Sequence, residues 1–316
     1  MKAEELRDVC DKLLSEVSTV IVGKRHTLEL VLTGFLANGH ILFEDFPGLA
    51  KTLMSKLFAQ SLGCMFRRIQ FTPDLLPADI TGTYILDRRD GQFKLRQGPI
   101  FTNILLADEI NRAPPKTQSA LLESMQERQV TIEGDTYRLE RPFIVIATQN
   151  PIEYEGTYPL PEAQIDRFMM RLSVGYPNKE EEIDILSRRI ASHTDDYKVK
   201  SVMTPQLFLD AQKVTEEVHV DDAIKDYVVE IVQRTRSHSL VGLGSSPRGS
   251  LAILHLSRAK AALAGRDFVI PEDVKTVAVS ALSHRLLLKS GTWLAGTKAE
   301  EIVRGILDET KAPRTP

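Results

Sequence analysis

Apolar residues recur every three or four positions at both ends of this chain. Such spacing places them on one face of a helix, so residues 6–17 and 28–35 are predicted to form two amphipathic helices. Beyond residue 178 the same spacing dominates, and we expect that part to be helical. The helices predicted there cover residues 208–218, 223–235, 249–264 and 271–288, with one more beginning at Ile183.

Between these two parts lie five apolar runs of strand length, several of them apolar on both faces. They cover residues 40–43, 66–71, 103–107, 143–148 and 168–174. A strand that is buried on both faces is typical of a parallel sheet covered by helices. Segments with helical spacing, such as 53–62 and 116–126, separate several of these runs, which predicts an α/β fold.

Two alternating stretches within the α/β part predict β-hairpins. Residues 84–86 and 92–95 flank one turn, and residues 130–139 alternate around another. One hairpin precedes and the other follows the strand at 103–107. Both could therefore project from the same end of the sheet.

The pattern changes near Tyr176, where strand-like runs stop. With 316 residues, this predicts an α/β domain over residues 1–176, including the N-terminal helices, and a helical domain over residues 177–316. The composition, 42% hydrophobic and 26% charged, is that of a globular protein. A net charge of -3 lacks the basic excess that drives nucleic-acid binding, so no nucleic-acid partner is expected.

The apolar runs fall far short of the ~20 residues that a membrane helix needs. The charged N-terminal segment also differs from a secretion signal. We therefore expect no membrane insertion and a cytoplasmic location. The chain has two cysteines, Cys10 and Cys64, and its seven histidines show no paired spacing with cysteine or acidic residues, so neither a disulfide nor a transition-metal site is expected.

A strand, a short loop and a helix follow one another early in the α/β part, which is the context that a phosphate-binding loop needs. The loop runs from Asp45 to Ala50. In the helix that follows, Lys51 can reach the β- and γ-phosphates and the Thr52 hydroxyl can bind Mg²⁺, while backbone N–H groups face the anion. The general pattern has glycine at the positions of Asp45 and Ala50, and the only glycine within this loop is Gly48. Taken alone, the loop fits an ordinary strand-to-helix turn equally well.

The strand at residues 103–107 ends in two carboxylates, at the sheet edge where open α/β folds bind ligands. Adjacent carboxylates are costly to bury without a partner. A metal ion supplies one: Asp108 can enter the ligand shell of Mg²⁺, and Glu109 can orient and activate the attacking water. The other interpretation is a solvated strand end followed by a helix cap. The phosphate loop upstream favours the metal site.

Five motifs in the expected order resemble those of the MoxR-type AAA+ ATPases, and the resemblance covers nearly the whole chain. They occupy residues 47–52, 106–113, 147–151, 163–168 and 246–249. The resemblance implies a P-loop AAA+ core with a parallel sheet and two inserted hairpins, followed by a small all-helical lid domain. It also implies ATP and Mg²⁺ as cofactors.

The resemblance suggests roles for individual residues. The nucleotide would be bound by Val22, Gly23, Pro47, Gly48, Leu49, Ala50, Lys51, Thr52, Asp108 and Arg248, with Thr52 and Asp108 holding the metal. Catalysis would involve Glu109, Asn150, Arg167 and Arg248. A turn between helices explains Val22 and Gly23 nearly as well as a place beside adenine. Asp45 is expected to face away from the phosphates, because its charge would repel them.

Two of these residues resemble the sensors of the family. Asn150 follows the strand at 143–148, which in this fold lies beside the Asp108 strand, so its amide could touch the γ-phosphate or the attacking water. The alternative is an Asn-Pro turn. Arg248 lies in the first turn of a helix that opens with Ser246-Pro247, where a cation opposes the helix dipole. It resembles the second sensor, which reaches from the lid toward the γ-phosphate.

Arg167 resembles the arginine finger, which enters the site of a neighbouring subunit and stabilises charge in the transition state. The alternative is a surface salt bridge with Asp166 or Glu162. Arg112 is a second candidate for a contact across the interface.

These features predict a ring-forming ATPase, with six subunits expected, whose lid and hairpins move with ATP to remodel protein clients. The resemblance implies a chaperone-like role and a possible partner with a von Willebrand factor A domain. Two other functions fit part of the sequence. A P-loop kinase acting on a small molecule would use Lys51 and Asp108 but leaves Arg167 and Arg248 unexplained, and a nucleotide-gated scaffold without hydrolysis leaves Glu109 unexplained.

Overall fold

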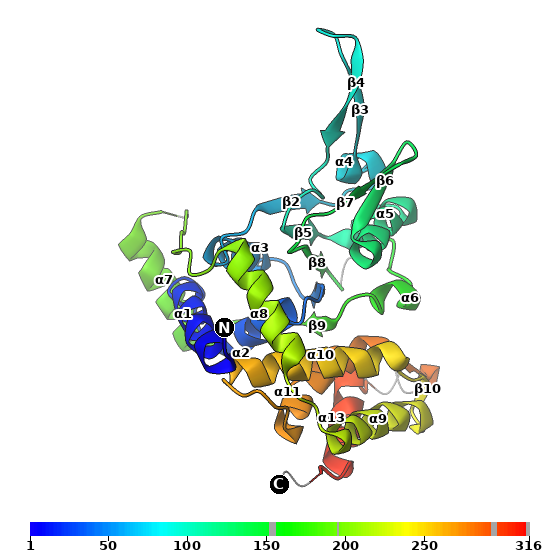
Figure 1. The fold of residues 1–316 in the computed structure, drawn as a ribbon. Helices are drawn as coiled ribbons and strands as arrows, with labels where there is room; N and C mark the ends of the chain where they lie inside the picture. The colour runs from blue at the N-terminus through cyan, green and yellow to red at the C-terminus, as the bar shows by residue number, and fades with distance from the viewer. Residues whose placement is uncertain (152–155, 195, 292–295, 314–316) are drawn as a thin grey trace.

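The computed structural model describes residues 1–151, 156–194, 196–291 and 296–313. At its centre is a five-stranded parallel sheet with the order β2-β5-β8-β1-β9 (Figure 1). Its strands are β1 (Ile41–Glu44), β2 (Phe66–Gln70), β5 (Ile104–Asp108), β8 (Ile144–Gln149) and β9 (Met170–Leu172). The predicted parallel sheet of five strands is confirmed.

Helices cover both faces of this sheet. Leu106 of β5 packs in a hydrophobic cluster with the helices at residues 3–18, 25–36 and 51–61, whereas the preceding Leu105 packs in a second cluster with the helix at 115–127. Both leucines are fully buried, which explains why the strands are apolar at consecutive positions. The helices of this part are α1 (Ala3–Ser18), α2 (Arg25–Leu36), α3 (Lys51–Ser61), α4 (Pro77–Thr81), α5 (Pro115–Glu127) and α6 (Glu162–Ile165).

The two predicted hairpins are confirmed. They are formed by β3 (Gly82–Asp87) with β4 (Gln92–Gln97), and by β6 (Gln129–Ile132) with β7 (Asp135–Arg138). The β3–β4 hairpin projects far from the body of the molecule, and β6 and β7 lie near its base (Figure 1). The Tyr84 hydroxyl of β3 donates a hydrogen bond to Asp135 Oδ2 (2.6 Å) and also contacts the Tyr137 hydroxyl. The hairpins therefore lie together at one end of the sheet.

Helices make up most of the C-terminal part, as predicted. They are α7 (Lys179–Ser192), α8 (Pro205–Glu217), α9 (Asp222–Ser237), α10 (Pro247–Leu263), α11 (Pro271–Leu282) and α13 (Ala299–Glu309). The expectation of an all-helical lid needs one correction, because β10 (Val241–Leu243) pairs antiparallel with β11 (Leu287–Leu288). The helix predicted over 271–288 accordingly ends at Leu282. Strands of two or three residues are too short to give a periodic signal.

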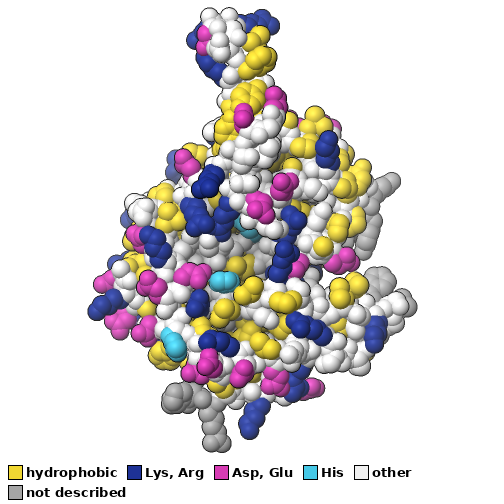
Figure 2. Space-filling model, turned by 45° about the vertical axis from the view of Figure 1, so that its right-hand side comes forward, with side chains coloured by type: hydrophobic (Ala, Val, Ile, Leu, Met, Phe, Trp, Pro, Cys, Tyr) yellow, Lys and Arg dark blue, Asp and Glu magenta, His cyan; other side chains and the backbone are white. Residues whose placement is uncertain are grey.

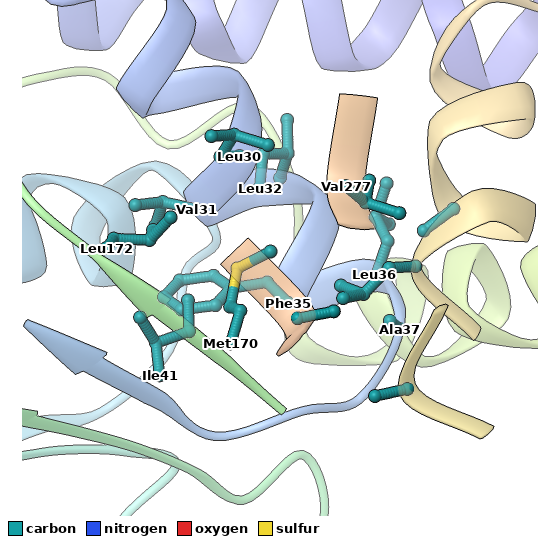
Figure 3. Packing of buried hydrophobic residues seen from close by; sticks show 14 of the residues in the cluster. Leu30, Val31, Leu32, Phe35, Leu36, Ala37, Ile41, Met170, Leu172 and Val277 are labelled. Atoms are coloured by element: carbon teal, nitrogen blue, oxygen red, sulfur yellow. The ribbon is translucent and has the colours of Figure 1, made fainter. Parts of the chain in front are cut away.

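One hydrophobic cluster connects the N-terminal helices, the sheet and the C-terminal helices. Figure 3 shows Phe35 of α2, Met170 of β9 and Val277 of α11 within this cluster. The division into domains at residues 176 and 177 stays a prediction, since buried packing continues across it. None of the helices in the described residues is both long enough and apolar enough to cross a membrane.

Candidate functional site

The loop between β1 and α3 turns through two residues with left-handed backbone, Gly48 (φ 82°) and Ala50 (φ 57°). Glycine adopts this conformation freely, whereas the Cβ of alanine crowds the backbone at a cost of about 1 kcal/mol. Ala50 directly precedes α3, so its conformation turns the chain into the helix that begins at Lys51. Ala50 thus has the backbone conformation that glycine most easily supplies in this kind of loop.

The Lys51 ammonium group is folded onto its own loop. Its Nζ donates hydrogen bonds to the carbonyl oxygens of Asp45 (2.7 Å) and Phe46 (3.0 Å). Burial lowers the pKa of Lys51, while the carboxylates of Asp45, Asp108 and Glu109 act in the opposite direction. The charges of the carboxylates at the end of β5 therefore act on Lys51. To reach a phosphate, the Lys51 ammonium group has to break its hydrogen bonds to the two carbonyl oxygens.

The Asp45 carboxylate is bonded to the chain that leaves β9, while residue 45 also lines a cavity together with Lys51, so its expected direction away from the phosphates stays a prediction. Its Oδ2 accepts hydrogen bonds from the backbone N–H groups of Val174 (2.6 Å) and Gly175 (2.9 Å) and from the Ser173 hydroxyl (3.0 Å). The carboxylate therefore ties the phosphate loop to the chain that leaves β9. Nothing in the local sequence indicated this role, because its partners are about 130 positions away.

One threonine of β8 contacts both residues that end β5. The Thr148 hydroxyl donates to Asp108 Oδ1 (2.6 Å) and accepts from the backbone N–H of Glu109 (2.8 Å). Glu109 has left-handed backbone, with φ 56°, which is uncommon for a residue other than glycine. The predicted position of β8 beside β5 is confirmed by their pairing.

Polar side chains of β2 complete this cluster, and the sequence interpretation missed them. Arg68 donates from Nε (3.0 Å) and Nη2 (2.7 Å) to Asp108 Oδ2, and Gln70 donates from Nε2 to Glu109 Oε2 (2.7 Å). Arg112, a candidate for an interface contact, instead lies 3.1 Å from Glu109 Oε2 in the same chain. The available signal was the alternation on β2, since residues 68 and 70 share a face and end beside the carboxylates.

Two cavities meet at the phosphate loop. The polar one, of about 430 Å³, is lined by Lys51, Thr52, Asp108, Glu109 and Asn150 among others. The second, of about 530 Å³, is largely apolar and is lined by Val22 and Pro177 among others. Both share a wall formed by residues 48–50 and Leu53. Adjoining polar and apolar chambers suit a ligand with phosphates at one end and a flat base at the other.

The remaining predicted nucleotide residues differ in where they lie. Pro47, Gly48, Leu49 and Ala50 line the polar cavity with Lys51 and Thr52. Gly23 is not among the lining residues of either cavity; it turns the chain with φ 70° against the Glu181 side chain of α7. Its neighbour Val22 is therefore the residue of this pair that could touch a base.

The donor atoms around Lys51 fit a magnesium ion. Thr52 offers a hydroxyl and Asp108 a carboxylate, which are the hard oxygen ligands that Mg²⁺ prefers in nucleotide sites. When bound, the ion would neutralise charge on the phosphates. Asn150 directly follows β8 and lines the same cavity, so the structure brings together the predicted set of Lys51, Thr52, Asp108, Glu109 and Asn150.

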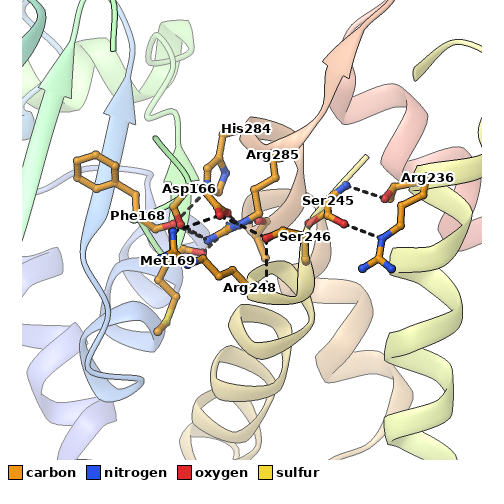
Figure 4. A network of polar contacts seen from close by, with 11 residues as sticks. Asp166, Phe168, Met169, Arg236, Ser245, Ser246, Arg248, His284 and Arg285 are labelled. Atoms are coloured by element: carbon orange, nitrogen blue, oxygen red, sulfur yellow. Dashed lines mark hydrogen bonds and ion pairs between the residues drawn. The ribbon is translucent and has the colours of Figure 1, made fainter. Parts of the chain in front are cut away.

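Arg167 and Arg248 do not lie in that set. Both line a third cavity, of about 280 Å³, which shares no lining residue with the two cavities at the loop. Arg248 Nη1 is 3.5 Å from Asp166 Oδ2, and the buried Arg285 donates to Asp166 Oδ1 at 2.7 Å (Figure 4). Ser246, which caps α10, also donates to Asp166 Oδ2 (3.3 Å). These contacts hold the start of α10 beside the loop before β9.

In this conformation Arg248 lines a different cavity from Lys51, and its predicted contact with the γ-phosphate stays a prediction. The alternative for Arg167, a salt bridge with Asp166 or Glu162, is not met. Within the described ranges Arg167 forms no ion pair, and its buried Nε has no hydrogen-bond partner. Asp166 is occupied by two other arginines.

Comparisons with known proteins match this architecture. The family model for ATPases associated with various cellular activities (AAA) matches residues 40–170, and that for the AAA lid domain matches residues 233–306. The chain is 49% identical to "Uncharacterized protein YeaC" of Bacillus subtilis, covering 98% of this chain and 97% of that protein. It is 44% identical to "Chaperone MoxR1" of Mycobacterium tuberculosis, covering 96% and 82%.

The crystal structure of a protein from Cytophaga hutchinsonii, provisionally assigned as an ATPase, superposes with a TM-score of 0.92 at 40% identity. It covers 99% of this chain and 97% of that one. The "Protein MoxR" of Paracoccus denitrificans is 31% identical over 85% of this chain and 86% of its own length. This chain belongs to the MoxR-type AAA+ ATPases.

As a MoxR-type protein, the chain is an ATPase by family, and its family is chaperone-like. The residues matched by the AAA family model include Arg167 and all those that line the polar cavity, and the residues matched by the lid model include Arg248. The P-loop kinase alternative is not favoured by this membership.

Proposed function

We propose that this MoxR-type protein hydrolyses ATP with Mg²⁺ at the junction of the two loop cavities. The observation that carries the proposal is the polar cavity, which gathers residues from the start of α3 and from the ends of β5 and β8: Lys51, Thr52, Asp108, Glu109 and Asn150. The adjoining apolar cavity has the size and lining for an adenine base.

Each residue has a role that its position supports. Lys51 binds the phosphates after releasing the carbonyl groups of its loop, and Thr52 and Asp108 hold the metal. Glu109 accepts a proton from the attacking water once its carboxylate turns from Gln70 and Arg112. The Asn150 amide, at the end of β8, orients that water or the γ-phosphate.

Arg167 and Arg248 act, in this proposal, on ATP held by a neighbouring subunit. They share one cavity and lie apart from their own loop, so a second copy has to present its phosphates to them. On the face seen in Figure 2, Lys and Arg side chains gather around the middle of the molecule, below the projecting hairpin. This arrangement supports a ring, for which we propose six subunits.

The projecting β3–β4 hairpin supports a role in remodelling protein clients. Ile85, Leu86 and Phe93 are exposed at 45%, 52% and 70%, and hydrophobic side chains are visible on the hairpin in Figure 2. Exposed apolar side chains on such an extension are suited to binding unfolded segments. A partner with a von Willebrand factor A domain and a cytoplasmic location are part of the same proposal, by analogy with the family.

Two substitutions test the proposed chemistry. Lys51→Ala should abolish ATP turnover by removing the phosphate ligand, whereas Glu109→Gln should bind ATP and retain it, because the base is lost but the binding residues remain. Phosphate release and retention of labelled ATP after gel filtration measure the two effects. ATP binding by wild type without turnover at any protein concentration would contradict hydrolysis, and phosphate appearing on an added metabolite would point to a kinase.

A further inference from the structure

Arg68 is a charged residue of the polar cavity to which the proposed chemistry assigns no role. It lies on β2, the edge strand next to β5, and lines the same cavity as Lys51 and Asp108. Its guanidinium makes two hydrogen bonds to Asp108 Oδ2, at 2.7 and 3.0 Å, and a third to Gln70 Oε1 at 2.7 Å. A cation therefore already neutralises the carboxylate that is proposed to hold Mg²⁺.

Both oxygens of Asp108 are engaged in this arrangement. Oδ2 accepts from Arg68, and Oδ1 accepts from the Thr148 hydroxyl. The threonine is neutral and can stay in place when a cation binds, whereas the positive guanidinium repels a second cation at the same carboxylate. Metal binding at Asp108 and the Arg68 ion pair therefore compete.

The ion pair is placed so that it can open. The Arg68 side chain is 48% exposed, while that of Asp108 is 13% exposed, so the arginine can swing into solvent without leaving a buried pocket. An ion pair with one largely exposed partner is weakened by solvent on that side, so it is easier to open than a fully buried pair. A divalent ion that arrives with the phosphates can displace such a partner.

We propose that Arg68 is a built-in competitor of the magnesium ion, which sets the Mg²⁺ concentration that nucleotide binding requires. This inference rests on the proposed function. The same arginine bonds Gln70, whose amide bonds Glu109, so the displacement also loosens the contact that holds the proposed base. Arg68 is a positioning residue, since it acts through Asp108.

The test measures binding of a slowly hydrolysed ATP analogue over a series of Mg²⁺ concentrations. For Arg68→Gln, the Mg²⁺ concentration that gives half-maximal binding should fall about two- to fivefold, the size of one partly exposed ion pair. Arg68→Lys keeps the charge but loses the two hydrogen bonds of the guanidinium, so its half-maximal Mg²⁺ concentration should lie between those of wild type and Arg68→Gln. The matched control is Arg67→Gln, because residue 67 points to the opposite face of β2 and should leave the requirement unchanged.

A half-maximal Mg²⁺ concentration that is equal or higher in Arg68→Gln overturns the inference. So does a variant that loses analogue affinity at saturating Mg²⁺ with an unchanged metal requirement, because Arg68 would then be a phosphate ligand. If wild type binds no analogue at any Mg²⁺ concentration, the proposed function fails as well. Thermal unfolding without nucleotide checks that each variant is folded.

Discussion

Two residues at the proposed site have left-handed backbone although neither is glycine. Ala50 has φ 57° and Glu109 has φ 56°, at the start of α3 and at the end of β5. Each such conformation costs about 1 kcal/mol or more and persists only where surrounding contacts impose it. At Glu109 the Thr148 hydroxyl supplies one of these contacts. Single residues thus hold strain at the two points where the proposed phosphate and water would lie.

At the same scale, Asp45 is predicted to be a structural residue rather than a defect of the phosphate loop. Asp45→Gly restores the glycine of the general pattern but leaves the N–H groups of Val174 and Gly175 without their acceptor. We expect a loss of about 2 to 4 kcal/mol in the free energy of unfolding. Urea unfolding measures it.

Asp45→Asn is the matched variant, since it keeps an acceptor oxygen and should lose less stability than Asp45→Gly. If Asp45→Gly is as stable as wild type and binds ATP more tightly, the aspartate has no structural role and only lowers the affinity of the loop for ATP.

At the scale of elements, the two hairpins are joined through their side chains. Tyr84 of β3 contacts Asp135 and Tyr137 of β7, and Thr83 donates to Glu133 at 3.5 Å. The hairpins leave the sheet before and after β5, the strand that ends in Asp108. The chain therefore connects the carboxylates to both hairpins, through β5 on one side and α5 on the other, and the tyrosine contacts join the two hairpins to each other.

Tyr84→Phe should uncouple the hairpins with little effect on the sheet. Phenylalanine keeps the ring but removes the hydroxyl that donates to the Asp135 carboxylate, and the effect should be local because this contact lies at the exposed hairpin surface. Hydrogen–deuterium exchange should become faster over residues 82–97 and 129–138 and stay unchanged in β8. Phe93→Ser, at an exposed position of β4, is the control and should not accelerate exchange at 129–138.

At the scale of the whole molecule, the loop cavities and the arginine cavity are separate. The loop lies at the carboxyl ends of β1 and β5, whereas Arg167, in the loop before β9, and Arg248, in α10, line a different cavity. One chain cannot bring both to one phosphate in this conformation. An assembly of several subunits can do so if the arginine cavity of one subunit lies against the loop cavities of its neighbour.

Mixing two inactive variants tests this arrangement. Arg167→Ala keeps its own loop but lacks the finger, and Lys51→Ala keeps the finger but lacks the loop. Mixed subunits should regain ATP turnover to a fraction set by the mixing ratio, and Arg248→Ala should behave like Arg167→Ala. The control partner carries both Lys51→Ala and Arg167→Ala and should give no recovery. Equal recovery with that partner would mean that the arginines do not act across an interface.

Much of this organisation could be predicted because it is local. The five strands, the two hairpins and most of the helices follow from spacing along the chain, whereas α4, α6 and α13 were not predicted. Asp108 ends one buried strand, and Asn150 directly follows another. Family membership confirms the class of protein that these motifs predicted. The short β10–β11 pair escaped prediction, since its strands are too brief to show a period.

By itself, the sequence determined which elements form and which residues end the strands of the sheet, because periodicity and strand ends are local properties. Only the tertiary structure decided which side chains meet there. Arg68 reaches Asp108 across 40 positions and Asp45 reaches Gly175 across 130, because strand order places β2 beside β5 and β1 beside β9. Arg248 lies beside Asp166 rather than above Lys51 for the same reason: contacts between distant segments depend on packing, which hydrophobic spacing leaves open.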